Sequence, residues 1–253
     1  MSGEVVLLPL LFLTGLTAGL IDAIAGGGGL ITLPVLLSTG MPPKLALGTN
    51  KFQSSFGSFT ASYYYSRRDV AHPRRAKLGI IMTLVGAGLG AWAVQQVDSD
   101  VLSGFVPFLL LAIALYTLLT PKLGEVRTVP KISETTFYIL TGIILGFYDG
   151  FFGPGVGSFW TILFVFGLGF DLMKATGYTK VMNFASNIIS FVVFFIGGHI
   201  WFLGGACMAV GQILGSRIGA SLAIKRGARF IRPLYITVVL ATIVKLLWGR
   251  WSG

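Results

Sequence analysis

The chain has 253 residues, of which 54% are hydrophobic and only 11% are charged, and its mean hydropathy is +0.82. A soluble domain cannot bury so much apolar surface, so the composition excludes one and predicts an integral membrane protein. The formal net charge of +10 does not indicate a nucleic-acid partner. The basic residues lie in short loops between apolar runs, which is typical of the cytoplasmic loops of a membrane protein.

Eight long apolar runs predict membrane-spanning helices, at 5–24, 46–66, 77–97, 101–120, 135–152, 178–197, 201–224 and 233–249. Two shorter runs, 28–39 and 156–169, each follow a glycine cluster. As helices these would rise only about 18–21 Å, which is less than the ~30 Å hydrocarbon core. We therefore expect half-helices or re-entrant segments there, within an all-α, polytopic transmembrane bundle.

Loop charges predict the orientation of the chain. The loops 67–77, 121–134 and 225–232 are rich in Lys and Arg and are expected on the cytoplasmic side. The connection 98–100 is acidic, and 197–199 carries no Lys or Arg, so both are expected outside. This assignment also places both termini outside.

The two halves of the chain repeat one motif. An acid precedes a glycine cluster in each half, and a lysine follows at the flank of a later apolar run; the offsets are 127 residues between Asp22 and Asp149 and 129 between Lys51 and Lys180. Equivalent loops carry opposite charge patterns. The pattern predicts two inverted repeats, 1–125 and 126–253, each with about four long segments and one short one. The alternative is a parallel arrangement of four plus four, in which each short run continues a kinked neighbour.

The glycine clusters are candidate anion-binding elements. If a half-helix begins after each cluster, its free N–H groups and positive dipole end point at the break, and glycine lets a ligand approach the backbone. The candidates are Gly26, Gly27, Gly28, Gly29, Gly153, Gly155 and Gly157. The alternative is that these glycines only permit close helix packing.

Charged side chains within apolar sequence are costly and need a reason. Lys51 and Lys180 would supply countercharge to an oxyanion, together with nearby hydroxyl and amide groups at Thr49, Asn50, Thr179 and Asn183. The alternative is that the lysines form structural ion pairs with Asp22 or Asp149, and both interpretations can hold together. The two aspartates either carry protons or shape the glycine turns. Arg217 and Gln212 are second-rank candidates.

Other chemistries have weaker support. The two histidines, His72 and His199, are too few and too dispersed for a metal site. The sequence shows neither a nucleophile–base constellation nor a phosphate-binding Walker loop. We therefore expect a protein that is not an enzyme and that has no metal, cofactor or nucleic-acid partner. The glycine-rich stretches 86–90 and 211–219 fit helix packing inside one protomer or between two, so a homodimer stays open.

At these motifs the sequence resembles the sulfite exporter TauE/SafE family, also called the toluene-sulfonate-uptake permease superfamily. The resemblance is carried by residues 18–34, 46–51 and 146–155 and extends over nearly the whole chain. It implies a multi-pass permease of the bacterial or archaeal inner (cytoplasmic) membrane whose substrates are small anions or organosulfur compounds.

The sequence therefore predicts a secondary transporter of a small anion, such as sulfite or an organosulfonate, that works by alternating access with or without coupling to protons. The alternatives are an anion channel and a membrane-embedded enzyme that acts on an anionic substrate. The matched pairs of charged residues disfavour the enzyme, which would need an asymmetric catalytic set.

Overall fold

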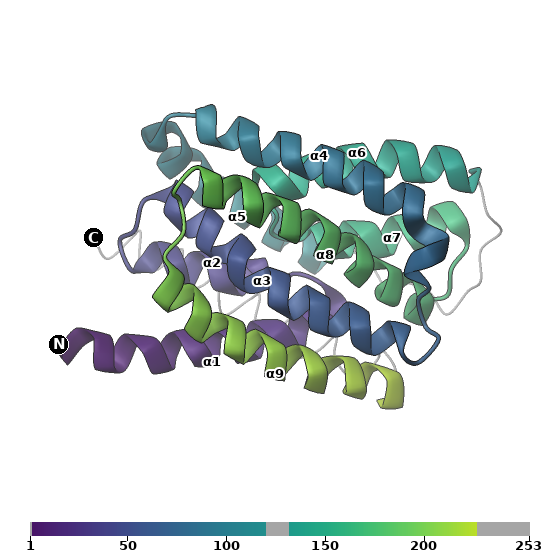
Figure 1. Ribbon diagram of the computed structural model, residues 1–253, viewed down its shortest axis with the longest axis horizontal. Helices are drawn as coiled ribbons and strands as arrows, with labels where there is room; N and C mark the ends of the chain where they lie inside the picture. The colour runs from purple at the N-terminus through teal and green to yellow at the C-terminus, as the bar shows by residue number, and fades with distance from the viewer. Residues whose placement is uncertain (1, 120–131, 227–253) are drawn as a thin grey trace.

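The computed structural model describes residues 2–119 and 132–226, and this part of the chain is an all-α bundle (Figure 1). Its long helices are α1 (Ser2–Ala25), α3 (Pro43–Ser66), α4 (Lys77–Gln96), α5 (Ser99–Leu119), α6 (Glu134–Phe151), α8 (Leu172–Ile196) and α9 (Phe202–Arg226). Its short helices are α2 (Gly29–Ser38), the 3₁₀ helix η1 (Pro73–Ala76) and α7 (Val156–Leu168). The predicted segments within the described residues match these helices closely, and the last predicted span, 233–249, lies outside the described residues.

Several described helices are suited to a lipid environment. Four segments are long and apolar enough to cross a membrane: Leu7–Ala25, Pro73–Gln96, Leu172–Ile196 and Phe202–Arg226. Large apolar side chains such as Leu89 and Trp92 of α4 are exposed on the surface. Such surface would be unfavourable in water but is favourable against lipid. The prediction of an all-α membrane bundle is confirmed.

Glycines allow two pairs of helices to pack with their backbones in contact. A β-carbon on Gly19 of α1 would lie 2.7 Å from the backbone oxygen of Gln212 in α9. Likewise, a β-carbon on Gly146 of α6 would lie 2.7 Å from the backbone oxygen of Thr83 in α4. Gly86 and Gly90 of α4 face the backbone of α6 in the same way, and Gly211 and Gly215 of α9 face the backbone of α1. Small residues spaced four apart permit this approach within membranes, so the glycine-rich stretches of α4 and α9 serve close packing.

The first helical hairpin is made by α1 and α2. Gly15 packs on Met208 and Gly19 packs on Gln212, so α1 runs in the same direction as α9. After the break at residues 26–28 the chain reverses, and α2 leads back towards the end of the bundle at which α1 begins (Figure 1). The predicted short segment is therefore the second arm of a hairpin, not a complete crossing.

The second hairpin, α6 and α7, enters from the opposite end of the bundle (Figure 1). Gly142 packs on Met82 and Gly146 packs on Thr83, so α6 runs in the same direction as α4. The chain reverses again after Phe151, and α7 leads back. The directions of the two hairpins fit the predicted inverted repeats, whose boundaries at 1–125 and 126–253 stay a prediction.

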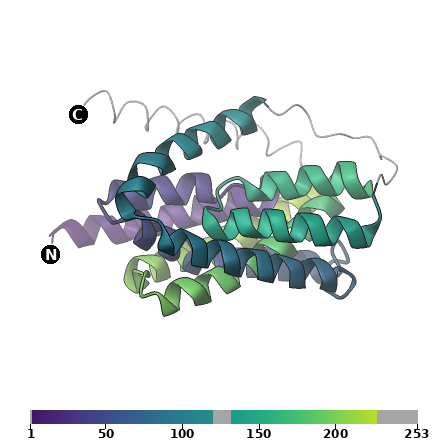
Figure 2. The ribbon, with the colours of Figure 1, turned by 90° about the horizontal axis from the view of Figure 1, so that it is seen from above.

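The central helices α3 and α8 run antiparallel. Near the start of α3, Gly48 packs on Phe194 and His199, whereas near the start of α8, Gly177 packs on Tyr65 and Val70. Figure 2 shows α5 crossing the bundle obliquely, while most of the other helices follow its long axis. Within this central pair, α3 contacts both helices of the first hairpin and α8 contacts both helices of the second.

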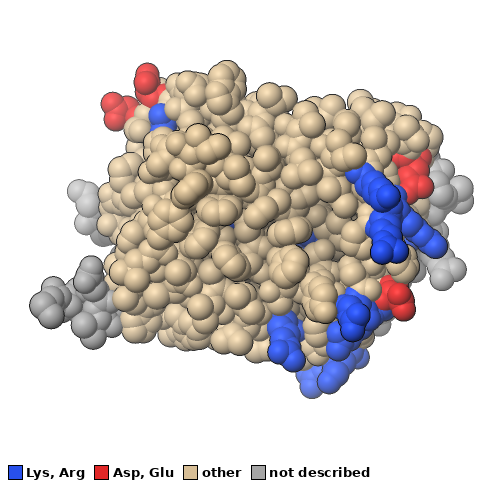
Figure 3. Space-filling model, viewed as in Figure 1, with Lys and Arg blue, Asp and Glu red and all other residues tan. Residues whose placement is uncertain are grey.

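Most of the exposed charged side chains lie near the two ends of the bundle. On the face shown in Figure 3, Lys and Arg cluster at the end where α3 finishes and α4 begins, and the band between the ends is almost free of charge. The residues at and near this basic end are Arg67, Arg68, Arg74, Arg75, Lys77, Lys225 and Arg226. α1 begins at the opposite end.

Candidate functional site

Both helix breaks depend on glycine. The backbone adopts positive φ at Gly26 (74°) and Gly27 (102°) in the first break and at Gly153 (101°) and Gly155 (83°) in the second. This left-handed region is unfavourable for residues with a β-carbon. The two glycine clusters therefore permit the reversals between α1 and α2 and between α6 and α7.

The tips of the two hairpins touch inside the bundle. A β-carbon on Gly26 would lie 2.8 Å from the Cα atom of Gly157, and a β-carbon on Gly157 would lie 2.8 Å from the Cα atom of Gly26. Gly29 similarly faces Pro154, with 3.3 Å between its hypothetical β-carbon and the Cα atom. The two breaks therefore meet backbone against backbone, and the starts of α2 and α7 lie near one another.

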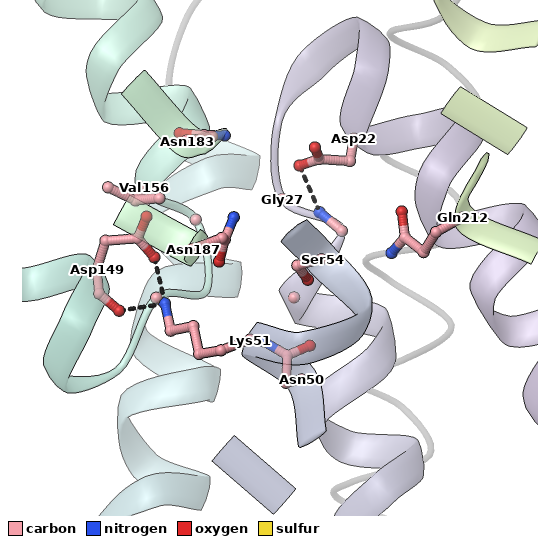
Figure 4. A pocket seen from close by; sticks show the side chains of 14 residues that line it. Asp22, Gly27, Asn50, Lys51, Ser54, Asp149, Val156, Asn183, Asn187 and Gln212 are labelled. Carbon is pink, nitrogen blue, oxygen red and sulfur yellow. Dashed lines mark hydrogen bonds and ion pairs between the residues drawn. The ribbon is translucent and has the colours of Figure 1, made fainter. Parts of the chain in front are cut away.

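A small polar cavity opens beside this contact (Figure 4). Its volume of about 30 Å³ suits a ligand of a few heavy atoms. Glycine backbone and polar side chains form nearly all of the wall, and the lining residues are Asp22, Gly27, Gly28, Gly29, Asn50, Lys51, Ser54, Asp149, Gly153, Gly155, Val156, Asn183, Asn187 and Gln212. Val156 is the single lining residue with an apolar side chain among those the structure describes.

Lys51 of α3 pairs with Asp149 of α6 in the cavity wall. The Nζ atom of Lys51 lies 2.6 Å from Oδ1 of Asp149 and also donates to the backbone oxygen of Asp149. Both side chains are almost completely buried, with 1% and 3% of their surface exposed. The second carboxylate oxygen accepts a hydrogen bond from Ser186 of α8. These contacts stabilise the two opposite charges against their loss of hydration.

Lys180 of α8 pairs with Asp22 of α1. Its Nζ atom lies 3.0 Å from Oδ2 of Asp22, and the lysine side chain is fully buried. The other carboxylate oxygen accepts a hydrogen bond from the N–H of Gly28 at 3.2 Å. Asp22 therefore ties the first break to a helix of the other half of the chain.

The two ion pairs are crossed between the halves of the chain. The lysine at position 51 binds the aspartate at position 149, and the lysine at position 180 binds the aspartate at position 22. The ion pairing that sequence analysis gave as the alternative is present in the geometry, and the role of these residues in anion binding stays a proposal. Because the pairs are crossed, two ion pairs as well as helix packing hold the two halves of the chain together.

A second pair of contacts repeats at the same spacing. Thr32 of α2 donates to Asn50 of α3 at 2.5 Å, and the hydroxyls of Thr161 in α7 and Thr179 in α8 lie 3.0 Å apart. Each contact joins residues 18 positions apart. Both short helices are therefore attached to the long helix that follows them, which holds their first turns beside the cavity.

Hydrogen-bond donors face the cavity from several helices. Figure 4 shows Asn183 on the side of the cavity that carries Asp149 and Val156, and Gln212 on the opposite side, near Asp22 and Gly27. Asn183 and Gln212 are buried, and the side-chain oxygen of Asn183, an acceptor, has no hydrogen-bond partner among the described residues. Lysine, amide and helix-terminal N–H groups are the donors expected around an oxyanion.

The structure brings most of the sequence candidates to the cavity, but not all. Six candidates do not line it, and five of these make contacts elsewhere: Gly26 and Gly157 touch each other, Lys180 binds Asp22, Thr179 contacts Thr161, and Thr49 accepts the N–H of Trp201. Arg217 differs from these, because its side chain is exposed on α9. The second-rank candidate Gln212, by contrast, lies in the wall.

Sequence analysis missed Ser54, Val156 and Ser186. Ser54 lies 129 positions before Asn183, the same offset that relates the two lysines, so the repeat could have indicated it. Val156 follows the second glycine turn directly. Ser186 carried no signal, because a serine in a membrane helix usually bonds the backbone of its own helix.

Comparison with known proteins identifies the family. The model of the family described as sulfite exporter TauE/SafE matches residues 11–246. The chain belongs to this family. No solved structure matches it.

Three relatives show how far the similarity extends. A protein of Haemophilus influenzae described as a "Probable membrane transporter protein" is 45% identical over 244 residues, which cover 96% of each chain. "Probable membrane transporter protein YfcA" of Escherichia coli K12 is 45% identical over 242 residues, covering 96% of this chain and 90% of the relative. An archaeal relative, "Probable membrane transporter protein MJ0441" of Methanocaldococcus jannaschii, is 25% identical over 259 residues, covering 95% and 94%. The chain is thus a multi-pass member of a family of membrane transporters.

Proposed function

We propose that the protein is a secondary transporter of a small, hydrophilic anion, with sulfur oxyanions such as sulfite as the first candidates. The observation that carries this proposal is the convergence of donors in one cavity: the Lys51 ammonium, the starts of α2 and α7, and the amides of Asn183 and Gln212. A cavity of about 30 Å³ with a polar wall favours an inorganic or very short organic anion over an aromatic sulfonate.

Charge balance supports coupling to protons. Two lysines and two aspartates form the two ion pairs at the site, so their formal charges cancel before any ligand arrives. A monovalent anion would leave an excess negative charge in a low-dielectric interior, which is costly. A proton taken up by Asp22 or Asp149 removes this excess, so we propose that anion and proton move together.

The crossed arrangement supports alternating access. The hairpin tips meet through Gly26 and Gly157 without intervening side chains, and two ion pairs link the halves. A rocking movement of one half against the other would separate the tips and open the cavity towards one end at a time. We place the protein in the inner membrane, with the basic end in the cytoplasm and the start of α1 outside.

Uptake into proteoliposomes tests the proposal. Sulfite, sulfate, methanesulfonate and acetate would be supplied with and without an inward proton gradient, and we expect saturable uptake of at least one anion that the gradient accelerates. Uptake that shows counterflow indicates a carrier, whereas a large, non-saturating current indicates a channel. Failure of all four anions to enter would contradict the proposed substrate class.

A matched pair of variants links transport to the site. Lys51→Met/Asp149→Leu replaces the whole ion pair by apolar side chains, which avoids leaving one buried charge without its partner. We expect this variant to fold but to lose anion uptake. Lys77→Met removes an exposed lysine and should retain uptake. Full uptake by the folded double variant would remove Lys51 from the transport site.

A further inference from the structure

The Lys51 ammonium lies in the cavity wall, but its charge is already neutralised. It makes two contacts with Asp149, one to the carboxylate at 2.6 Å and one to the backbone oxygen. An ammonium group has three N–H donors, so one residue engages two of them. A ligand that enters the cavity therefore meets a lysine whose countercharge is in place.

The Asp149 carboxylate is held in a position that an anion could take. Its second oxygen accepts from Ser186, and the side chain is buried. Next to it, a β-carbon on Gly153 would lie 2.6 Å from the Nζ atom of Lys51 and 2.8 Å from Oδ1 of Asp149. The missing side chain at Gly153 therefore leaves the ion pair accessible from the glycine turn.

Both members of the ion pair between Lys51 and Asp149 line the cavity, whereas the other pair contributes only its acid. Asp22 lines the cavity, whereas Lys180 does not. The Asp22 carboxylate accepts the N–H of Gly28, next to the start of α2. In both pairs a carboxylate thus accepts hydrogen bonds from donors of the kind that bind an oxyanion. The donor is a lysine for Asp149 and the N–H at a helix start for Asp22.

We propose that Asp149 is a tethered competitor of the substrate: its carboxylate occupies the anion position on Lys51 in the empty protein, and the transported anion binds by displacing it. This inference rests on the proposed function and specifies how the site works. Two negative groups on one ammonium repel each other strongly where water is excluded. The carboxylate and the anion therefore exchange, and the return of Asp149 to Lys51 expels the anion after transport.

The proposal predicts that removal of the competitor strengthens binding. Asp149→Asn keeps the size of the side chain but removes its charge, so Lys51 is left without a built-in countercharge. The half-saturating concentration of sulfite should fall about tenfold, because the binding-competent form is no longer a minor fraction. Ser186→Ala removes the hydrogen bond that anchors the Asp149 carboxylate. By the same argument, this change should lower the half-saturating concentration of sulfite about threefold.

Binding is measured by thermal stabilisation of the purified full-length protein in detergent over a series of sulfite concentrations. Asp171→Asn is the control, because it makes the same chemical change at an exposed residue at the start of α8. This control should match the wild-type protein. A folded Asp149→Asn variant with unchanged or weaker sulfite affinity would overturn the proposal.

Three further outcomes are decisive. If Asp149→Asn does not fold, Ser186→Ala decides, and unchanged sulfite affinity in this variant overturns the competitor. If the wild-type protein neither binds nor transports any of the four test anions, the proposed function fails and the competitor fails with it. If the wild-type protein binds and transports sulfite while both variants show no gain, only the competitor is wrong.

Discussion

The ammonium of Lys180 lies 3.0 Å from the carboxylate of Asp22, although the two residues are 158 positions apart in the chain. The same carboxylate accepts the N–H of Gly28 at the first helix break. One aspartate therefore fixes the turn of its own half and binds a helix of the other. The stability of the break and the association of the halves should depend on it together.

Removal of only one partner should be costly. Lys180→Met would leave the Asp22 carboxylate without its countercharge, and we expect the free energy of unfolding to fall by about 3–5 kcal/mol, as for other broken buried pairs. The double variant Lys180→Met/Asp22→Leu should recover much of this loss. Denaturant unfolding in detergent measures both, with the exposed Lys77→Met as control. A double variant less stable than Lys180→Met would contradict the crossed pair.

The contact between the hairpin tips should not tolerate a methyl group. Gly157→Ala would place a β-carbon 2.8 Å from the Cα atom of Gly26, so the tips must separate. We expect a lower unfolding temperature and loss of anion uptake. Gly88→Ala is the matched control, because its β-carbon would lie 3.5 Å from Ile189, at ordinary contact distance. Equal behaviour of the two variants would show that the tips do not touch.

The threonine contacts of the short helices α2 and α7 should make similar contributions to the stability of the protein. Thr161→Val preserves shape but removes the hydroxyl that lies 3.0 Å from Thr179, and Thr32→Val removes the donor to Asn50. Each change should cost about 0.5–1.5 kcal/mol, the usual net contribution of one hydrogen bond. Thermal unfolding measures this loss, and Thr17→Val, at an exposed position, should change little. A large loss of stability for only one of the two variants would argue against equivalent roles of the two threonine contacts.

His199 should make stability depend on pH. It lies in the loop between α8 and α9, where its Nδ1 atom is 2.9 Å from Oε1 of Gln95. Burial and the nearby Lys44 lower the pKa of His199 below 6.5. The folded chain then binds fewer protons than the unfolded chain near this pKa, so stability is full above about pH 6.5 and falls at lower pH.

The contribution of this histidine can be isolated. Unfolding temperatures of the wild-type protein and His199→Gln would be compared at pH 8, 7, 6 and 5.5. The decline at low pH should be smaller in the variant, because it has no imidazole to protonate. Parallel curves for the two proteins would mean that other groups cause the decline.

Gln212 and Arg217 distinguish the cavity from the outer surface of α9. Gln212→Leu removes an amide from the cavity wall and should lower sulfite uptake severalfold, since about 1 kcal/mol is lost with one hydrogen bond. Arg217→Gln changes an exposed residue on the same helix and should leave uptake near the wild-type rate. The opposite ranking would place the substrate elsewhere. Initial rates in proteoliposomes measure both.

The sequence was sufficient to predict the helices and to single out the paired charged residues as important. The apolar runs predicted α1 to α9 closely because charged loops and glycine clusters bound them. The duplicated motif indicated Asp22, Lys51, Asp149 and Lys180 before any contact was known. The crossed pairing was beyond prediction, because it depends on how α3 and α8 pack side by side. The same holds for Ser186, whose contact with Asp149 joins two helices.

The meeting of the hairpin tips would also determine where a membrane potential acts on a transported ion. The two glycine turns reach the interior from opposite ends of the bundle and meet at the contact between Gly26 and Gly157. If water follows each turn inwards, the membrane voltage falls across this thin contact. An elementary charge that crosses the full voltage exchanges about 2.3 kcal/mol per 100 mV. An ion that moves a few ångströms past the glycines would then gain or lose most of that energy in a single step.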